Sequence, residues 1–352
     1  MTKASQYKQR LDRDPSEGLK RKLSADEVMK LTNELGDWRS FTAVPEKIRE
    51  YSEEPSFRAA LSAFSDMDSG NKRQTLQGIC QVTIKPDGRV LGALPKLLTY
   101  MRDNGFVPFY YVEESMTFSE AREIWKFQWN IATIDRAAIF EELLGLGKQL
   151  TIFFYDMSRL PGDIPATVRL RTLKGSALKE YRDGSTLRDR IEAPNRVLTL
   201  IHAPDEPIDI LRELGIRSPA KNLYFRLQSL FESALQTVGG TRNVEENLLQ
   251  IAQEDLVQYE NWSKSLQEPR IQAVVSQLKL EIDNLDDSAL KKIDDGALLR
   301  YFNRFFGTSQ KDFEVWDMLF TASFLVSHDL PGVCRIDEDG VSGWKNGAGL
   351  CL

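Results

Sequence analysis

Only two imidazole side chains occur in this 352-residue chain, His202 and His328, so any chemistry that needs a histidine must use one of them. His202 follows the apolar run VLTLI at residues 197–201 and precedes Ala-Pro-Asp, a pattern typical of a strand that ends in a turn. The helix expected over residues 208–214 carries Glu213. A histidine at a strand end can face a cleft while a carboxylate on the next helix orients its other ring nitrogen, as a nucleophilic or acid–base histidine requires. Position alone also fits a structural histidine, and His328 suits a helix C-terminal cap.

Cationic side chains precede His202 along the chain. Lys85 directly follows the β-branched run ICQVTI at residues 79–84 and opens Lys-Pro-Asp-Gly, in which proline and glycine favour a turn. Arg169, Arg171 and Arg188 follow later. Guanidinium groups match phosphate oxygens, and phosphoryl transfer depends mainly on positioning and on neutralising charge. Each arginine alone is typical of a solvated surface charge, but a fold that holds these cations together would make a phosphate pocket.

Three ordered segments resemble the nucleoside diphosphate kinase family. Residues 82–106 contain the strand, the Lys-Pro-Asp and a helix that ends at Gly-Phe; residues 171–191 match its Arg-x-x-x-Gly stretch and the later Gly-Thr-Ile-Arg. Residues 200–216 resemble its Ile-His-Gly-Ser-Asp block, with a glutamate eleven positions after the histidine. The resemblance covers about residues 76–217 and implies an α/β fold, an α+β sandwich of the ferredoxin-like kind.

The resemblance also implies roles for particular side chains. His202 corresponds to the phosphohistidine nucleophile of that family, and Glu213 to the carboxylate that orients its imidazole. Phe140, or Ile139 beside it, corresponds to the apolar platform under the base. The residues implied to bind nucleotide are Lys85, Arg136, Arg171, Thr186, Arg188, Thr199 and Phe140.

The implied activity is a ping-pong phosphotransfer, in which the γ-phosphoryl of a nucleoside triphosphate passes to His202 and then to a diphosphate. Mg²⁺ is expected as a cofactor that arrives with the nucleotide and needs no dedicated protein ligands. Two alternatives stay open: an enzyme of the same fold with an unusual phosphorylated acceptor, and a non-catalytic nucleotide-binding regulatory or scaffold protein.

Four positions differ from the family pattern. Thr199 stands where an asparagine is expected, Pro204 replaces a serine, and Ala177 replaces a threonine. Trp125 corresponds to the tyrosine near the catalytic histidine. Because a hydrogen bond to a charged group contributes about 1.5–3 kcal/mol, we expect these substitutions to lower the activity or redirect it.

The surrounding elements are predicted from hydrophobic periodicity and from turn residues. Strands alternating with helices imply an α/β sandwich with loops free to build a site. The expected strands cover residues 79–84, 106–113, 150–155 and 197–201, and the expected helices cover residues 91–102, 119–129, 137–146 and 208–214.

Composition and length bound the remaining expectations. A chain of 352 residues predicts more than one unit: a charged, partly helical region over 1–75, the kinase-like domain over 76–217, and a helical domain with an irregular tail over 218–352.

A net charge of −6 disfavours a dedicated nucleic-acid binder. No apolar run reaches the about 18–20 residues of a membrane span, and the N-terminus lacks a secretory apolar core, so we expect no membrane partner and a cytoplasmic protein. The helical C-terminal region could support a homo-oligomer or a protein partner.

Overall fold

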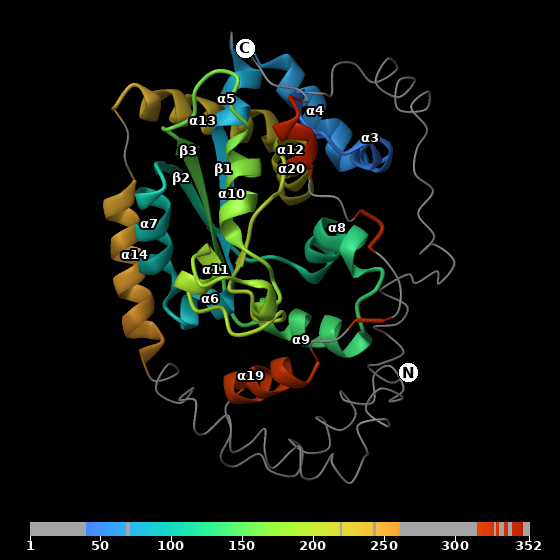
Figure 1. Cartoon of the computed structure of the whole chain (residues 1–352), viewed down its shortest axis with the longest axis vertical. Helices are drawn as coiled ribbons and strands as arrows, with labels where there is room; N and C mark the ends of the chain where they lie inside the picture. The colour runs from blue at the N-terminus through green and yellow to red at the C-terminus, as the bar shows by residue number, and fades with distance from the viewer. Residues whose placement is uncertain are drawn as a thin grey trace.

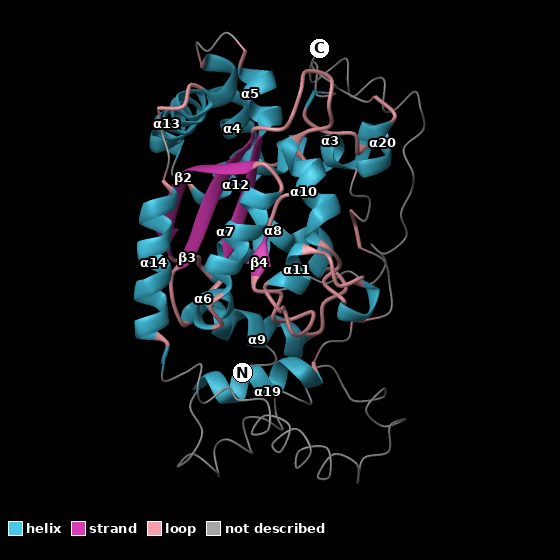
Figure 2. Cartoon of the chain, turned by 60° about the vertical axis from the view of Figure 1, so that its left-hand side comes forward, coloured by secondary structure: helices cyan, strands magenta, loops and turns pink. Residues whose placement is uncertain are grey.

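The computed structural model describes residues 40–67, 71–218, 220–241, 244–260, 315–326, 329–330, 334–336 and 340–347. These residues form a mixed structure in which helices surround one four-stranded antiparallel sheet (Figure 1, Figure 2). The strand order across the sheet is β2-β3-β1-β4. The strands are β1 (Ile79–Ile84), β2 (Phe106–Glu114), β3 (Gln149–Asp156) and β4 (Ile201–His202).

The central strand β1 sets the position of His202. All six residues of its sequence ICQVTI are buried, as its unbroken run of mostly β-branched and apolar residues predicts. On one side β1 pairs with β3, and on the other side Thr83 lies opposite His202 in the short ladder to β4. His202 is therefore part of the sheet itself, at its edge strand.

One face of the sheet is covered by helices that follow β1 and β3 in sequence and by one helix from the C-terminal region. Cys80, Val82 and Ile84 of β1 point into this apolar layer, because alternate residues of a strand face the same side. In Figure 1, α7 and α14 lie side by side along this layer. The helices concerned are α6 (Pro86–Val90), α7 (Ala93–Asp103), α10 (Ala166–Lys174) and α14 (Glu245–Gln258).

The opposite face packs against helices from both flanking regions of the chain. Ile79 and Phe153 share a core with Phe57 of α4 and Phe231 of α13. The helices here are α3 (Pro45–Ser52), α4 (Pro55–Asp66), α5 (Lys72–Gly78), α12 (Pro207–Arg217) and α13 (Ala220–Val238). The described flanking helices thus complete the core around the sheet, and the division of the chain into three parts stays a prediction.

Two helices between β2 and β3 form the wall beside β4. The first is α8 (Phe118–Trp129), which begins with a capping box of Thr117 and Glu120. The second is α9 (Ile134–Gly145), whose N-cap Thr133 accepts a hydrogen bond from the amide of Arg136. The remaining described helices are the 3₁₀ turn η3 (Lys179–Tyr181), α11 (Leu187–Arg190), α19 (Val315–Leu325) and α20 (Val341–Lys345).

Most predicted elements of the central region are confirmed within a few residues, and two predictions are wrong in extent. Only Ile201 and His202 pair with β1, because Leu200 adopts a positive φ of 62° that ends the extended run predicted over residues 197–201. The tail predicted to be irregular contains the short helix α20, in which Trp344 is fully buried. The run Ser24-Ala25-Asp26-Glu27 resembles a capping box and predicts a helix to about Leu35, but these residues lie outside the described ranges. Within the described ranges, no helix is both long and apolar enough to cross a bilayer.

Candidate active site

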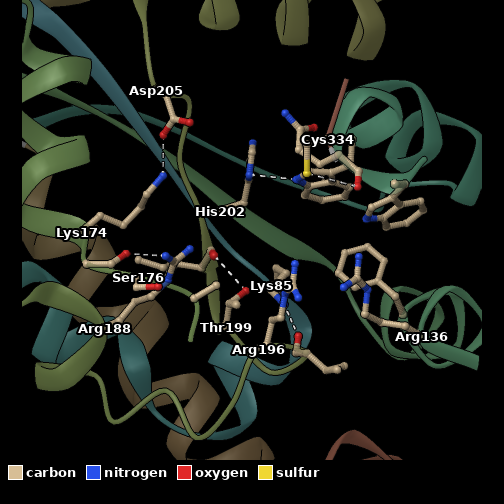
Figure 3. A pocket seen from close by; sticks show the side chains of 18 of the residues that line it. Lys85, Arg136, Lys174, Ser176, Arg188, Arg196, Thr199, His202, Asp205 and Cys334 are labelled. Carbon is tan, nitrogen blue, oxygen red and sulfur yellow. Dashed lines mark hydrogen bonds and ion pairs between the residues drawn. The ribbon is translucent and has the colours of Figure 1, made fainter. Parts of the chain in front are cut away.

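A pocket of about 330 Å³ opens beside His202, between β4, the α8–α9 wall and the end of α10. Figure 3 shows Lys174, Asp205 and Arg188 on one side of His202 and Arg136 and Cys334 on the other. The lining residues are Lys85, Trp125, Gln128, Trp129, Arg136, Ala137, Phe140, Arg171, Lys174, Gly175, Ser176, Ala177, Arg188, Arg196, Val197, Thr199, Ile201, His202, Asp205 and Cys334.

Both ring nitrogens of His202 have a partner. The Nε2 atom lies 2.6 Å from Oε1 of Glu213, and the indole N–H of Trp125 donates to Nδ1 over 3.2 Å. An indole nitrogen is a donor only, so Nδ1 must be the acceptor and Nε2 carries the proton that the carboxylate accepts. The imidazole side chain is 16 % exposed, whereas Glu213 lies buried behind it on α12. The neutral imidazole therefore keeps its lone pair on Nδ1.

Two cations form ion pairs with Asp205, which follows β4. The ammonium of Lys174 donates to Asp205 over 2.9 Å and to the carbonyl oxygen of Ala203 over 2.9 Å. Nε of Arg171 lies 3.3 Å from the same carboxylate oxygen. Burial favours the neutral form of Asp205, but the ion pairs with Lys174 and Arg171 outweigh it and hold the pKa of this carboxyl below its usual range.

The buried cations near Asp205 carry more positive charge than this one carboxylate neutralises. Burial lowers the pKa of Lys174 to about 8, against the opposing effect of Asp205. Burial likewise lowers the pKa of Arg188 to about 10, and its Nε has no hydrogen-bond partner although Nη1 donates to the carbonyl oxygen of Gly175 over 2.6 Å. A buried donor without a partner costs free energy, so these groups favour an anionic ligand.

Lys85 lies on the floor of the pocket at the end of β1. Its ammonium is 3.3 Å from Asp87, donates to the carbonyl oxygen of Val197 over 3.2 Å, and lies 5.2 Å from the ring centroid of Phe140. Burial lowers the pKa of Lys85, and the nearby Asp87 raises it less. Phe140, which the resemblance implies as a platform for a base, thus forms a cation–π pair with Lys85.

On the opposite side of His202, two arginines share one carboxylate. Arg136 of α9 and Arg196 both form ion pairs with Asp329, which belongs to the C-terminal segment. This segment is held by an isolated bridge between Asp329 and Ala132 and by a hydrogen bond from the amide of Leu330. We refer to Arg136 and Arg196 below as the paired arginines.

The structure brings most of the predicted site residues to this one pocket. Those that line it are His202, Lys85, Arg136, Arg171, Arg188, Thr199 and Phe140. Glu213 contacts the pocket only through His202, as expected for an orienting carboxylate. Thr186 does not line it: its hydroxyl caps α11 in a capping box with Asp189, and its contact with a nucleotide stays a prediction. Thr199 donates to the carbonyl oxygen of Ile201 over 3.3 Å.

Sequence reasoning did not identify Lys174, Arg196 and Trp129, which line the pocket. It also did not identify Asp329, which does not line the pocket but forms ion pairs with the paired arginines. Lys174 had a local signal, because it lies three positions after Arg171 on the same helix and so shares its face. Trp129 stacks with Trp125 at 5.7 Å between ring centroids, a contact at the helical spacing of four residues. Asp329 had no local signal, since its contact with Arg136 spans 193 positions of the chain.

The pocket does not fit a metal ion held by the protein. Throughout the described ranges, no group of three or more His, Cys, Asp or Glu side chains is placed to hold one. Asp205 is the single carboxylate among the lining residues, and cations already surround it. The expectation that Mg²⁺ arrives with the nucleotide stays a prediction.

Comparison with known proteins adds no family. No protein-family model matches this chain, and no curated protein matches it. The resemblance to nucleoside diphosphate kinases therefore rests on the ordered motifs, and the pocket geometry is an independent observation.

Proposed function

We propose that this chain is a nucleoside diphosphate kinase-like phosphotransferase that carries the phosphoryl group on Nδ1 of His202. The observation that carries the proposal is the state of the imidazole. Glu213 holds the proton on Nε2, and the lone pair of Nδ1 lies at a pocket lined by several buried cations. Such a nitrogen is a competent nucleophile toward a phosphate whose charge the cations neutralise.

The sheet topology supports the ferredoxin-like fold that the motifs imply. The parallel strands β1 and β2 are separated in the sheet by β3, and the parallel strands β3 and β4 are separated by β1. Helices α7 and α10 make the two crossovers. Two split β-α-β units of this kind are typical of the ferredoxin-like fold, and they support our assignment of the chain to it. The proposal places the catalytic histidine on the fourth strand.

The proposed transfer needs no proton movement. The Nδ1 lone pair attacks the γ-phosphorus, the bond from phosphorus to the bridging oxygen breaks, and the nucleoside diphosphate leaves. The phosphorylated ring becomes positively charged, and the carboxylate of Glu213 stabilises that charge through the Nε2–H hydrogen bond. In the second half-reaction a terminal phosphate oxygen of the acceptor attacks the phosphorus, and the N–P bond breaks to restore neutral His202.

The pocket cations would act on the phosphate oxygens. Lys85, Arg171 and Arg188 come from three different elements and all line the pocket, so together they hold a polyphosphate chain in one orientation. Positioning and charge neutralisation supply most of the acceleration in phosphoryl transfer. Removal of one such donor is expected to lower the transfer rate by about 10²–10³-fold, as for other groups that stabilise developing charge.

A second function is favoured by one contact, the hydrogen bond from Trp125 to Nδ1. That bond engages the lone pair which the nucleophile needs. If Trp125 stays in place when nucleotide binds, the pocket binds nucleotide without turnover, and the chain acts as a nucleotide-responsive regulatory protein. Phosphotransfer requires the indole N–H to move from Nδ1 to an oxygen of the incoming phosphoryl group.

Labelling with γ-labelled ATP and Mg²⁺ decides between these functions. Phosphohistidine is labile to acid and fairly stable to base, so we expect label with that behaviour on the wild type and on His328→Ala, the matched control for the other histidine. His202→Ala should take up no label. Label on His202→Ala would contradict the proposal, and nucleotide binding without label on the wild type would favour the regulatory function. A chase with a panel of diphosphates then identifies the acceptor.

A further inference from the structure

The face of β1 that looks toward α12 carries polar side chains in the core. Gln81 is 2 % exposed and Thr83 is 1 % exposed, although both lie on the central strand of the sheet. A buried amide or hydroxyl is unfavourable unless its polar atoms are hydrogen-bonded. The partners of these side chains therefore indicate why the strand carries them.

Gln81 bonds to the carboxylate that orients the histidine. Its Nε2 donates to Oε2 of Glu213 over 2.8 Å, while Oε1 of Glu213 is 2.6 Å from Nε2 of His202. Each carboxylate oxygen thus has its own donor, and the two bonds together fix the rotation of the carboxyl group. One chain of hydrogen bonds therefore runs from Gln81 on β1 through Glu213 on α12 to His202 on β4, at the pocket.

Pro204 stands where the resemblance to nucleoside diphosphate kinases implies a serine hydroxyl as a second hydrogen-bonding partner for Glu213. The resemblance places a serine two positions after the histidine, and Pro204 has neither a hydroxyl nor an amide hydrogen. Glu213 is 5 % exposed, so water replaces that donor poorly. The amide of Gln81 supplies the missing hydrogen bond from the sheet instead.

We propose that Gln81 is a positioning residue for the phosphotransfer reaction, acting through Glu213 to hold His202 as the Nε2–H tautomer. This inference rests on the proposed function of His202. Gln81 does not touch the pocket, so its removal should affect the nucleophile and leave nucleotide affinity unchanged. The bond it makes is to a charged group, and its loss should lower the rate of phosphohistidine formation about tenfold.

Gln81→Met and Thr83→Val form a matched pair of variants. Methionine nearly conserves the volume of glutamine and lacks its donor. Thr83 lies on the same buried face, but its hydroxyl bonds to Thr151 over 3.0 Å and not to Glu213. Both variants lose one buried hydrogen bond of β1, so a loss of stability alone would affect them alike.

A double-mutant cycle tests whether Gln81 acts through Glu213. In the wild-type background we expect Gln81→Met to slow labelling from γ-labelled ATP about tenfold at constant affinity, and Thr83→Val to change it less than twofold. In the Glu213→Ala background, Gln81→Met should slow labelling by less than a further twofold. Equal effects in both backgrounds, or a loss of affinity in place of rate, would overturn the inference.

Imidazole NMR separates failure of this inference from failure of the proposed function, because it needs no turnover. The chain has two histidines, and the signals absent from His202→Ala identify the ring of interest. We expect the Nε2–H proton of His202 to exchange with water at least about tenfold faster in Gln81→Met than in the wild type or Thr83→Val. An unchanged proton signal overturns the positioning role even if the wild type is phosphorylated. If Gln81→Met changes the proton signal but the wild type takes up no label, Gln81 does position the imidazole and the proposed phosphotransferase activity is wrong.

Discussion

Anion binding at the pocket should weaken as the pH rises above 8, and Lys174 should be the cause. Burial lowers the pKa of its ammonium to about 8 in the free site. A bound phosphate near the ammonium favours the charged form and raises the pKa again. Above pH 8 the free site has lost the proton and the bound site keeps it. Binding then takes up a proton and becomes less favourable with each further increase in pH.

The size of this pH effect on binding follows from the pKa shift of Lys174. A pKa that moves from 10.5 to about 8 corresponds to about 3 kcal/mol against the charged form, the net of burial and of the opposing attraction of Asp205. One unit of negative charge about 4 Å away contributes about 4 kcal/mol at an effective dielectric constant of about 20. The ligand therefore offsets the effect of burial and restores a pKa near the ordinary value. Between pH 8 and pH 9 the dissociation constant should rise several-fold, toward the limit of about tenfold per pH unit.

Isothermal titration with ADP between pH 7.5 and pH 9 measures this effect. Phosphate groups with a second pKa near about 6 are fully ionised in that range. The range also stops short of the pKa of Arg188, which is about 10. Titrations in two buffers of different ionisation enthalpy count the protons taken up, and we expect a value approaching one at pH 9. Lys174→Met should bind more weakly and show no uptake. A wild-type affinity that is constant across the range, with no proton uptake, would refute the reasoning.

Three further substitutions test the structure around the pocket. Asp329→Asn should raise the affinity for ADP several-fold in a direct titration, because the paired arginines would no longer have an internal carboxylate to exchange for phosphate; unchanged affinity contradicts this. Gly88→Ala should lower stability by about 1–3 kcal/mol in denaturant unfolding, since its Cβ would lie 2.4 Å from the carbonyl oxygen of Leu200; a wild-type midpoint would show that the backbone yields freely. Trp344→Phe removes the donor that bonds the buried Glu206 over 2.7 Å and should lower stability by about 1–2 kcal/mol while labelling of His202 stays normal.

The local part of the fold could be predicted because short segments specify it. The runs ICQVTI at 79–84 and LTIFFY at 150–155 are too apolar and too β-branched for a surface helix, and both are strands of the sheet. The capping box at Thr117 likewise specifies where α8 begins. In the fold, Lys85 directly follows β1, and β1 pairs with the short strand β4 that carries His202.

The non-local part of the site could not be predicted in the same way. Asp329 reaches the paired arginines through a segment that has no strand or helix pattern of its own. Gln81 reads in sequence as one polar residue in a buried strand, and only the packing of α12 shows that its amide lies against Glu213. Hydrogen bonds between residues more than a hundred positions apart leave no periodic signal in a single sequence, so their partners emerge only from the fold.

The Lys-Pro-Asp motif has an architectural role that its resemblance to a nucleotide-binding motif does not convey. The backbone amide of Lys85 donates to the carbonyl oxygen of Leu200 over 3.0 Å, and the carboxylate of Asp87 accepts from the amide of Leu200 over 3.3 Å. Both groups of Leu200 are thereby held two positions before His202, where a positive φ turns the chain into β4. The same carboxylate lies 3.3 Å from the ammonium of Lys85. One buried aspartate thus fixes the pocket lysine and the backbone that leads into the histidine. The motif therefore specifies how far Lys85 lies from His202, and this architectural role does not depend on the proposed function.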